Sequence, residues 1–82
     1  MDRLATMRTF VSVAETGSFS ASARLLDVSA PLVSRHVGDL EAHLGIRLFN
    51  RTTRRVELSE AGEAYYPDCV ALLEQLDRGH FE

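Results

Sequence analysis

The feature of this sequence that most limits its fold is a three-residue link between two helical patterns. The shorter pattern runs from about residue 20 to residue 26, with Ser18 or Ser20 as its N-cap. The longer pattern follows the link and repeats apolar residues at helical spacing: Val33, Val37, Leu40 and Leu44. Because residues 27–29 are too few to let two helices lie antiparallel, the helices are expected to cross. The sequence therefore predicts a helix-turn-helix.

Another helix is predicted before this motif. Asp2 can cap its start, and Gly17 can end it in the left-handed conformation that favours glycine. Its apolar stripe is expected to face the core and consists of Leu4, Met7, Val11 and Ala14, with Phe10 beside them.

After Gly45, which ends the third helix, the pattern changes from a helical to a strand period. Apolar and polar residues alternate over 46–48 and again over 56–58, so two strands of a wing are expected. Ser59 is expected to cap a last helix that runs to about Arg78. The predicted fold is mainly α, a winged helix-turn-helix with three helices and a two-stranded β wing over residues 1–58. A long linker or dimerisation helix over residues 59–82 follows it.

One face of the third helix combines small, polar and cationic residues near the helix start. Ser29 is the predicted N-cap, and Pro31 falls in the first turn, where its missing N–H costs nothing. At about 100° per residue, the face opposite the apolar stripe holds Pro31, Ser34, Arg35 and Gly38. A helix N-terminus with free N–H groups favours anions such as phosphate.

The net charge of −3 is unusual for a protein that binds nucleic acid, but the charge is unevenly distributed. Residues 28–55 carry five arginines against two acids, a net charge of +3, whereas residues 56–82 carry seven acids against one arginine, a net charge of −6. Acidity confined to the last segment does not prevent the middle of the chain from binding phosphate.

The last predicted helix is more apolar than one small domain requires. We expect a partner helix to cover it, so the chain is predicted to form a homodimer. The predicted dimerisation residues are Tyr65, Tyr66, Cys69, Leu72, Leu73 and Leu76.

Several other classes of protein fit this sequence poorly. No stretch approaches the roughly 18 apolar residues of a membrane span, and the N-terminus lacks a signal-peptide pattern, so a cytoplasmic location is expected. The single cysteine, Cys69, cannot form an internal disulfide. His36, His43 and His80 are too scattered to bind one metal ion, and no arrangement of nucleophile and base is present. Neither a cofactor nor enzyme activity is expected.

Two linked blocks of sequence resemble the N-terminal domain of LysR-type transcriptional regulators. The first block is GSFSASARLL at residues 17–26 with VSAPLVSRHV at residues 28–37. The second continues from Leu40 and Glu41 through LGIRLFNR at residues 44–51 to Arg54, Arg55 and LSEAG at residues 58–62. Several blocks at matching spacing are far more specific than one isolated motif.

The resemblance implies a homodimer that binds double-stranded promoter or operator DNA at an interrupted inverted repeat. It implies that the recognition helix, about residues 30–44, enters the major groove and that the wing contacts the minor groove or backbone. It also implies a tetramer in a full-length protein, and a C-terminal domain that senses a small-molecule inducer, which this chain lacks. Ala30 stands where the family often has Gln, and Gly38 where a basic residue is common, so greater reliance on DNA shape is expected.

The predicted DNA contacts lie at the start of the recognition helix and in the wing. Arg35 can bind guanine or phosphate, Ser34 can bond a base or phosphate, and Pro31 can contact a thymine methyl. Arginines on a narrow wing suit a minor groove or the phosphate backbone. The complete set is Ser29, Ala30, Pro31, Ser34, Arg35, His36, Arg51, Thr52, Arg54 and Arg55.

Two alternatives stay open at this point. The first is a winged helix of another regulator family, or one that binds protein instead of DNA, which the acidic total charge favours. The second is a small enzyme or metal protein, for which the sequence offers no set of residues. Ser29 also has a purely structural interpretation as a helix cap, and Arg35 one as a solvated surface arginine.

Overall fold

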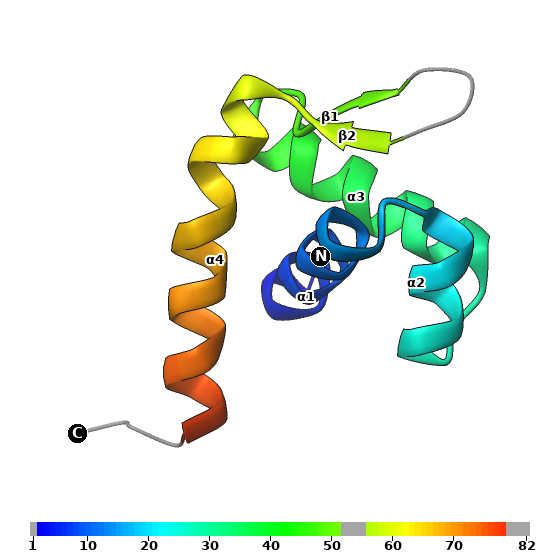
Figure 1. The fold of residues 1–82 in the computed structure, drawn as a ribbon, viewed down its shortest axis with the longest axis horizontal. Coiled ribbons are helices and arrows are strands. Elements are labelled where there is room, and N and C mark those ends of the chain that lie inside the picture. Colours follow the sequence, from blue (N-terminus) through cyan, green and yellow to red (C-terminus); the bar gives the residue numbers. More distant parts are fainter. Residues whose placement is uncertain (1, 52–55, 79–82) are drawn as a thin grey trace.

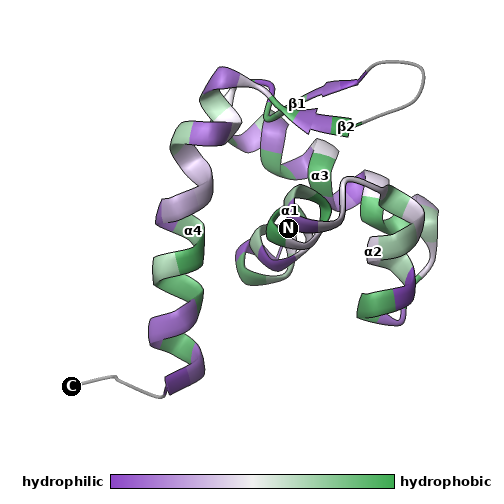
Figure 2. Cartoon of the chain, in the orientation of Figure 1, coloured by the Kyte–Doolittle hydropathy of each residue, from purple (hydrophilic) through white to green (hydrophobic). Residues whose placement is uncertain are grey.

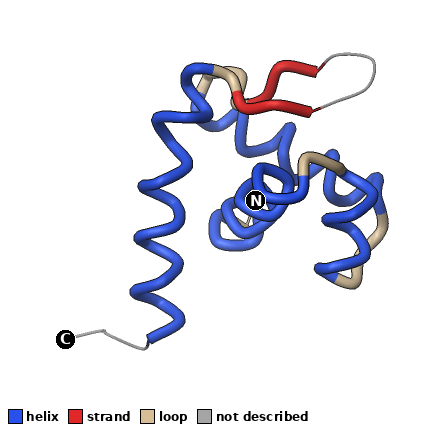
Figure 3. Tube along the Cα trace, in the orientation of Figure 1, coloured by secondary structure: helices blue, strands red, loops and turns tan. Residues whose placement is uncertain are grey.

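The computed structural model describes residues 2–51 and 56–78 of the 82-residue chain. Along the chain these residues form α1 (Arg3–Thr16), α2 (Phe19–Leu26), α3 (Ala30–Leu44), β1 (Phe49–Arg51), β2 (Val56–Leu58) and α4 (Glu60–Arg78). Figure 1 shows α1 at the centre, with α2 on one side and α4 on the other, and α1 contacts α2, α3 and α4. The prediction of a mainly helical fold with a two-stranded wing is confirmed (Figure 3).

The helix ends lie close to where the sequence places them. Asp2 Oδ1 accepts a hydrogen bond from the N–H of Ala5 at 3.1 Å, and Ser29 Oγ accepts one from Leu32 at 3.2 Å. Gly17 and Gly45 end α1 and α3 with positive φ angles of 70° and 72°. These predictions are confirmed, and α2 begins one residue earlier than expected.

The core lies where α1 and α3 meet, and it corrects the predicted face of α1. Val33, Val37 and Leu40 of α3 are fully buried, as expected. On α1, however, Leu4 is 42% exposed, whereas Thr6 and Thr9 are buried. Both threonine hydroxyls donate to carbonyl groups of their own helix, Thr6 to Arg3 at 2.9 Å and Thr9 to Ala5 at 2.8 Å. Because these bonds satisfy the hydroxyls, the buried face can include polar residues that an apolar pattern does not reveal.

The wing is an antiparallel pair in which Phe49 lies opposite Leu58 and Arg51 opposite Val56. The second strand lies where the sequence predicts it, but the prediction of a first strand over residues 46–48 is wrong. The N–H of Leu48 donates to the Glu41 carboxylate at 2.8 Å, and its carbonyl accepts from the N–H of Ser59 at 2.9 Å. Bonds to α3 and to the start of α4 thus occupy this segment, and strand pairing begins at Phe49.

Helix α4 ends at Arg78, as predicted, and it is one helix with Pro67 inside it. Ser59 Oγ accepts from the N–H of Gly62 at 3.0 Å and donates to the carbonyl of Arg47 at 2.6 Å, so the cap also ties α4 to the base of the wing. Apolar and polar residues alternate along α4 (Figure 2). None of the helices in residues 2–51 and 56–78 combines the length and hydrophobicity needed to span a membrane.

Candidate nucleic-acid interface

The outer edge of α3 presents the residues that the sequence predicts to meet DNA. Pro31 and Arg35 are exposed, and Ser34 is half-buried. The opposite side of the same helix is fixed in the core by Val33 and Val37, both fully buried. The prediction that this edge faces outward is therefore confirmed. A rigid helix presents one proline ring, one hydroxyl and one guanidinium on one side.

The start of α3 offers fewer free backbone donors than the sequence suggests. Ser29 is exposed, its hydroxyl accepts from the N–H of Leu32, and its carbonyl accepts from Val33 at 3.2 Å. Pro31 has no N–H. Among the residues that the structure describes, only Ala30 therefore keeps an unbonded N–H in the first turn of α3. Ala30 itself is half-buried against the core. Any anion site at this helix start therefore depends on the N–H groups of Ser29 and Ala30 and on the helix dipole.

His36 faces α1. Its Nδ1 lies 3.0 Å from the hydroxyl oxygen of Thr9. Because the Thr9 hydroxyl donates to the carbonyl of Ala5, Nδ1 must be the donor in this bond. Only Nε2 of His36 is left for a contact outside the domain. The ring also lines a small apolar pocket with Leu26 and Val28. No pattern in the sequence indicates this contact between α1 and α3.

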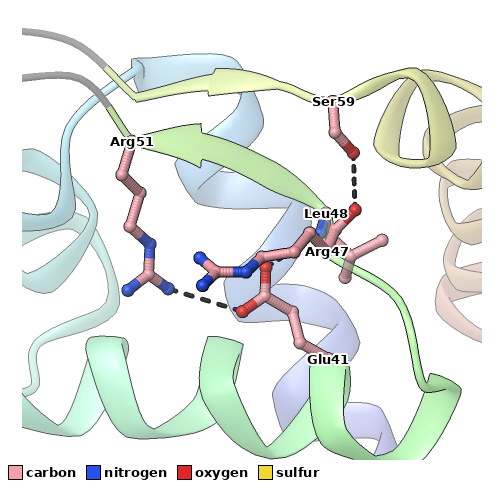
Figure 4. Close-up of polar contacts among 5 residues, drawn as sticks. All are labelled: Glu41, Arg47, Leu48, Arg51 and Ser59. Atoms are coloured by element: carbon pink, nitrogen blue, oxygen red, sulfur yellow. Dashed lines mark hydrogen bonds and ion pairs between the residues drawn. The ribbon is translucent and has the colours of Figure 1, made fainter.

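Of the predicted wing contacts, Thr52, Arg54 and Arg55 lie outside the described residues, so Arg51 is the one that the structure places. Its Nη2 lies 3.5 Å from Oε1 of Glu41, and its guanidinium carbon lies 5.3 Å from the centre of the Phe19 ring. Figure 4 shows Arg51 reaching from the wing toward Glu41 on α3. The side chain that the sequence assigns to DNA therefore has two partners within the domain.

Glu41 is a residue of this region that the sequence prediction missed. Its side chain is only 13% exposed, and its two oxygens bind Arg51 and the N–H of Leu48. A carboxylate withdrawn from water in this way requires such partners. The available signal was that Glu41 is one of only two acids in the otherwise basic segment 28–55 and adjoins the buried Leu40.

The predicted dimerisation residues divide into two groups. The first packs within the domain: Cys69 is fully buried and Leu73 nearly so, while Tyr65 and Tyr66 lie 5.5 and 6.4 Å from Phe10 between ring centres. The second group remains open, because Leu72 is 43% exposed and Leu76 is half-buried. Cys69 and Leu73 are thus covered without a partner chain, contrary to the expectation that a second helix must cover them.

The ionisable groups of α4 reflect this packing. Burial raises the pKa of Tyr65 to about 12 and also raises the pKa of the Cys69 thiol. The Tyr66 hydroxyl donates to Glu15 Oε2 at 2.9 Å, and this bond raises the pKa of Tyr66. Within the described part of the chain, no three His, Cys, Asp or Glu side chains are grouped so that they can bind a metal ion.

Known proteins resemble this chain over most of its length. Residues 4–63 match the profile of the family described as "Bacterial regulatory helix-turn-helix protein, lysR family". An HTH-type transcriptional repressor of Pseudomonas aeruginosa (strain UCBPP-PA14) is 49% identical over 77 residues, which are 94% of this chain and 24% of that protein. The chain therefore spans about a quarter of the length of this relative.

The protein domains in two solved protein–DNA complexes have the same fold as this chain. The DNA-binding domain of BenM bound to the catB site 1 DNA superimposes with a TM-score of 0.88 and 36% identity, over 92% of this chain and 84% of that one. The DNA-binding domain of CbnR in complex with DNA superimposes with a TM-score of 0.88 and 38% identity, over 93% of this chain and 87% of that one. The family and these relatives are regulators of transcription and not enzymes. The chain is a DNA-binding domain of the LysR family of bacterial transcription regulators.

Proposed function

We propose that this domain recognises a specific sequence in duplex DNA as a homodimer, with α3 in the major groove and the wing on the neighbouring minor groove or backbone. The observation that carries this proposal is the exposed edge of Pro31, Ser34 and Arg35 on a helix whose reverse side is fully buried. In helix-turn-helix proteins the N-terminal part of the second helix meets base edges. The DNA complexes of the BenM and CbnR domains support the same partner.

The chemistry of this edge suits a limited direct readout of bases. The Arg35 guanidinium can donate two hydrogen bonds to O6 and N7 of a guanine, Ser34 can bond a base or phosphate, and Pro31 can contact a thymine methyl. The side chain of Ala30 cannot form hydrogen bonds, and Gly38 has no side chain. We infer that DNA shape supplies the remaining specificity.

The other predicted contacts have secondary roles in this proposal. Ser29 caps α3 and places the helix start near a phosphate. His36 keeps only Nε2 for a phosphate, since Nδ1 bonds to Thr9. The wing arginines Arg54 and Arg55, with Thr52, are assigned to the minor groove or backbone from their sequence alone.

The proposed dimer forms through α4. Leu72 and Leu76 are one turn apart on this helix. The half-buried Tyr65, which packs against Phe10 within the domain, lies two turns before Leu72 on the same side and keeps part of its side chain exposed. Since Cys69 and Leu73 pack inward, the proposed contact between chains narrows to this partly exposed stripe. Residues 1–58 would then form the DNA-reading unit and residues 59–82 the linker. Tetramer formation and response to a small-molecule inducer are proposed only for a longer regulator with a sensing domain.

Selection of duplexes from a random pool, followed by titration at several salt concentrations, tests the proposal. We expect a defined sequence with two related half-sites to emerge. The logarithm of the association constant should fall with the logarithm of salt concentration, with a slope of about −0.9 per phosphate neutralised. A protein-binding winged helix would enrich no sequence and show no such slope. Failure to enrich any sequence would overturn the proposed function.

A further inference from the structure

Arg51 ends β1 and contacts both helices of the helix-turn-helix. Its guanidinium pairs with Glu41 of α3 at 3.5 Å and lies over the ring of Phe19 in the first turn of α2. The Phe19 ring in turn meets Phe49 of β1 edge-on, with 6.5 Å between ring centres. One side chain thus joins the outer end of β1 to the two helices beneath it.

Glu41 holds the other end of the same strand. Its Oε2 accepts the N–H of Leu48, the residue just before β1, at 2.8 Å, while its Oε1 faces Arg51. Leu48 is itself fully buried, so this end of the strand is also embedded in the core. In Figure 4, Glu41 rises from α3 between these two contacts. One carboxylate of α3 therefore contacts residues at both ends of the three-residue strand β1.

The strand register shows where along the wing the contact between Arg51 and Glu41 lies. Arg51 pairs with Val56, and this pair is the outermost described pair of the wing. Arg54 and Arg55 follow Arg51 in the sequence, so the contact between Arg51 and Glu41 lies at the last described position of β1 before the wing arginines. A duplex must receive α3 and the wing together. A wing already fixed relative to α3 avoids the entropy cost of ordering it on binding.

We propose that Glu41 and Arg51 form a clamp that sets the wing relative to α3. In this proposal Arg51 is a positioning residue and not a ligand of phosphate, and Glu41 favours DNA binding although it is an acid beside a polyanion. The inference rests on the proposed function, because it concerns how the two DNA-reading elements are held together.

Two substitutions on α3 that remove the same charge test the clamp. Glu41→Gln keeps an oxygen that can accept from Leu48 but removes the charge that pairs with Arg51. Asp39→Asn is the matched control, since the Asp39 side chain has no hydrogen bond or ion pair among the described residues. Loss of an acid near phosphate should tighten DNA binding through simple electrostatics. The clamp predicts that Glu41→Gln instead weakens binding to the selected duplex about three- to five-fold, whereas Asp39→Asn leaves it unchanged or tighter.

A double-mutant cycle separates positioning from direct contact. We expect Arg51→Met to weaken binding clearly in the wild-type background and much less in the Glu41→Gln background, because the clamp is already open. A direct phosphate contact by Arg51 predicts the same loss in both backgrounds. The affinity is measured per folded molecule, at a temperature where circular dichroism shows every variant folded. If the Glu41–Arg51 pair only stabilised the fold, the affinity measured in this way would not change.

Hydrogen exchange of the β1 and β2 amides tests the clamp without DNA. We expect these amides to exchange about three- to five-fold faster in Glu41→Gln and Arg51→Met than in Asp39→Asn. If the wild-type protein enriches no duplex, the proposed function fails while this measurement still decides the clamp. An unchanged exchange rate of the β1 and β2 amides would overturn the clamp. The clamp would also be overturned if Glu41→Gln bound DNA as tightly as Asp39→Asn, or if Arg51→Met lost the same affinity in the two backgrounds.

Discussion

Gly62, in the first turn of α4, lies directly against the backbone carbonyl of Leu48, and a Cβ placed on Gly62 would overlap that oxygen. The same Cβ would come within 3.0 Å of Cδ2 of Leu58. The Leu48 oxygen also accepts the N–H of Ser59 at 2.9 Å. The start of α4 therefore approaches the base of the wing at a distance that only glycine permits.

Gly62→Ala should destabilise the domain because the added methyl group must displace backbone of the wing base. We expect a loss of about 1–3 kcal/mol in the free energy of unfolding, measured by urea denaturation. Gly38→Ala is the matched control, since a Cβ at Gly38 meets open space on α3. Alanine there should be neutral or stabilise by up to about 1 kcal/mol. Equal stability of the two variants would contradict the close approach.

Arg35→Ala and Arg54→Ala should weaken DNA binding in different ways. Loss of Arg35 should cost about 1–3 kcal/mol on the selected duplex and relax discrimination at one base pair. Loss of Arg54 should weaken binding to all sequences alike. It should also make the slope of the logarithm of the association constant against the logarithm of salt concentration shallower, by the amount expected for about one phosphate contact. Arg78→Ala, at the end of α4, serves as a control with the same change of charge. Identical effects of Arg35→Ala and Arg54→Ala on selected and random duplexes would reject this division.

Leu72→Glu should break the dimer without unfolding the domain. Leu72 is partly exposed on α4, so a charged side chain there is tolerated in the monomer but not against a second apolar helix. Sedimentation equilibrium should show a monomer for Leu72→Glu at a concentration at which the wild-type chain is a dimer. Ala71→Glu, at the neighbouring exposed position, should remain dimeric. A wild-type chain that sediments as a monomer at high concentration would remove the basis for a dimer through α4.

The ion pair between α1 and α4 should make stability depend on pH. Arg8 Nη2 lies 2.9 Å from Asp77 Oδ1, and this hydrogen bond lowers the pKa of Asp77. Because the folded pKa is below the unfolded value of about 3.9, the stabilisation is complete above that pH and is lost as the pH falls through the folded pKa. Asp77→Asn should therefore lower the melting temperature slightly at pH 7, with a difference that disappears in acid.

Asp68→Asn is the matched control for this pair, because Asp68 is an exposed aspartate on the same helix. It should leave the melting temperature at pH 7 nearly unchanged. High salt should reduce the effect of Asp77→Asn, since both members of the pair are largely exposed. A difference in melting temperature that persists below pH 2 would argue against the ion pair as its cause.

The helices and their ends were predictable because each depends on residues close together in the sequence. Asp2 and Ser29 bond N–H groups three residues later, and Gly17 and Gly45 adopt a backbone conformation that their own lack of a side chain permits. The outward edge of α3 was predictable for a related reason. Once Val33 and Val37 define the buried side, helical geometry places Arg35 on the other.

The sequence alone thus determined the order of the elements, the crossing of α2 and α3 through a short link, and the helix edge proposed to meet DNA. Only the tertiary structure decided which contacts join the elements. It buried Thr9 and exposed Leu4, started β1 at Phe49, and directed Arg51 toward Glu41. Periodicity along a chain reports how a side chain is oriented on its own helix or strand. It does not report which atoms of a distant element lie opposite, and those atoms determine whether an arginine binds a carboxylate or remains free for phosphate.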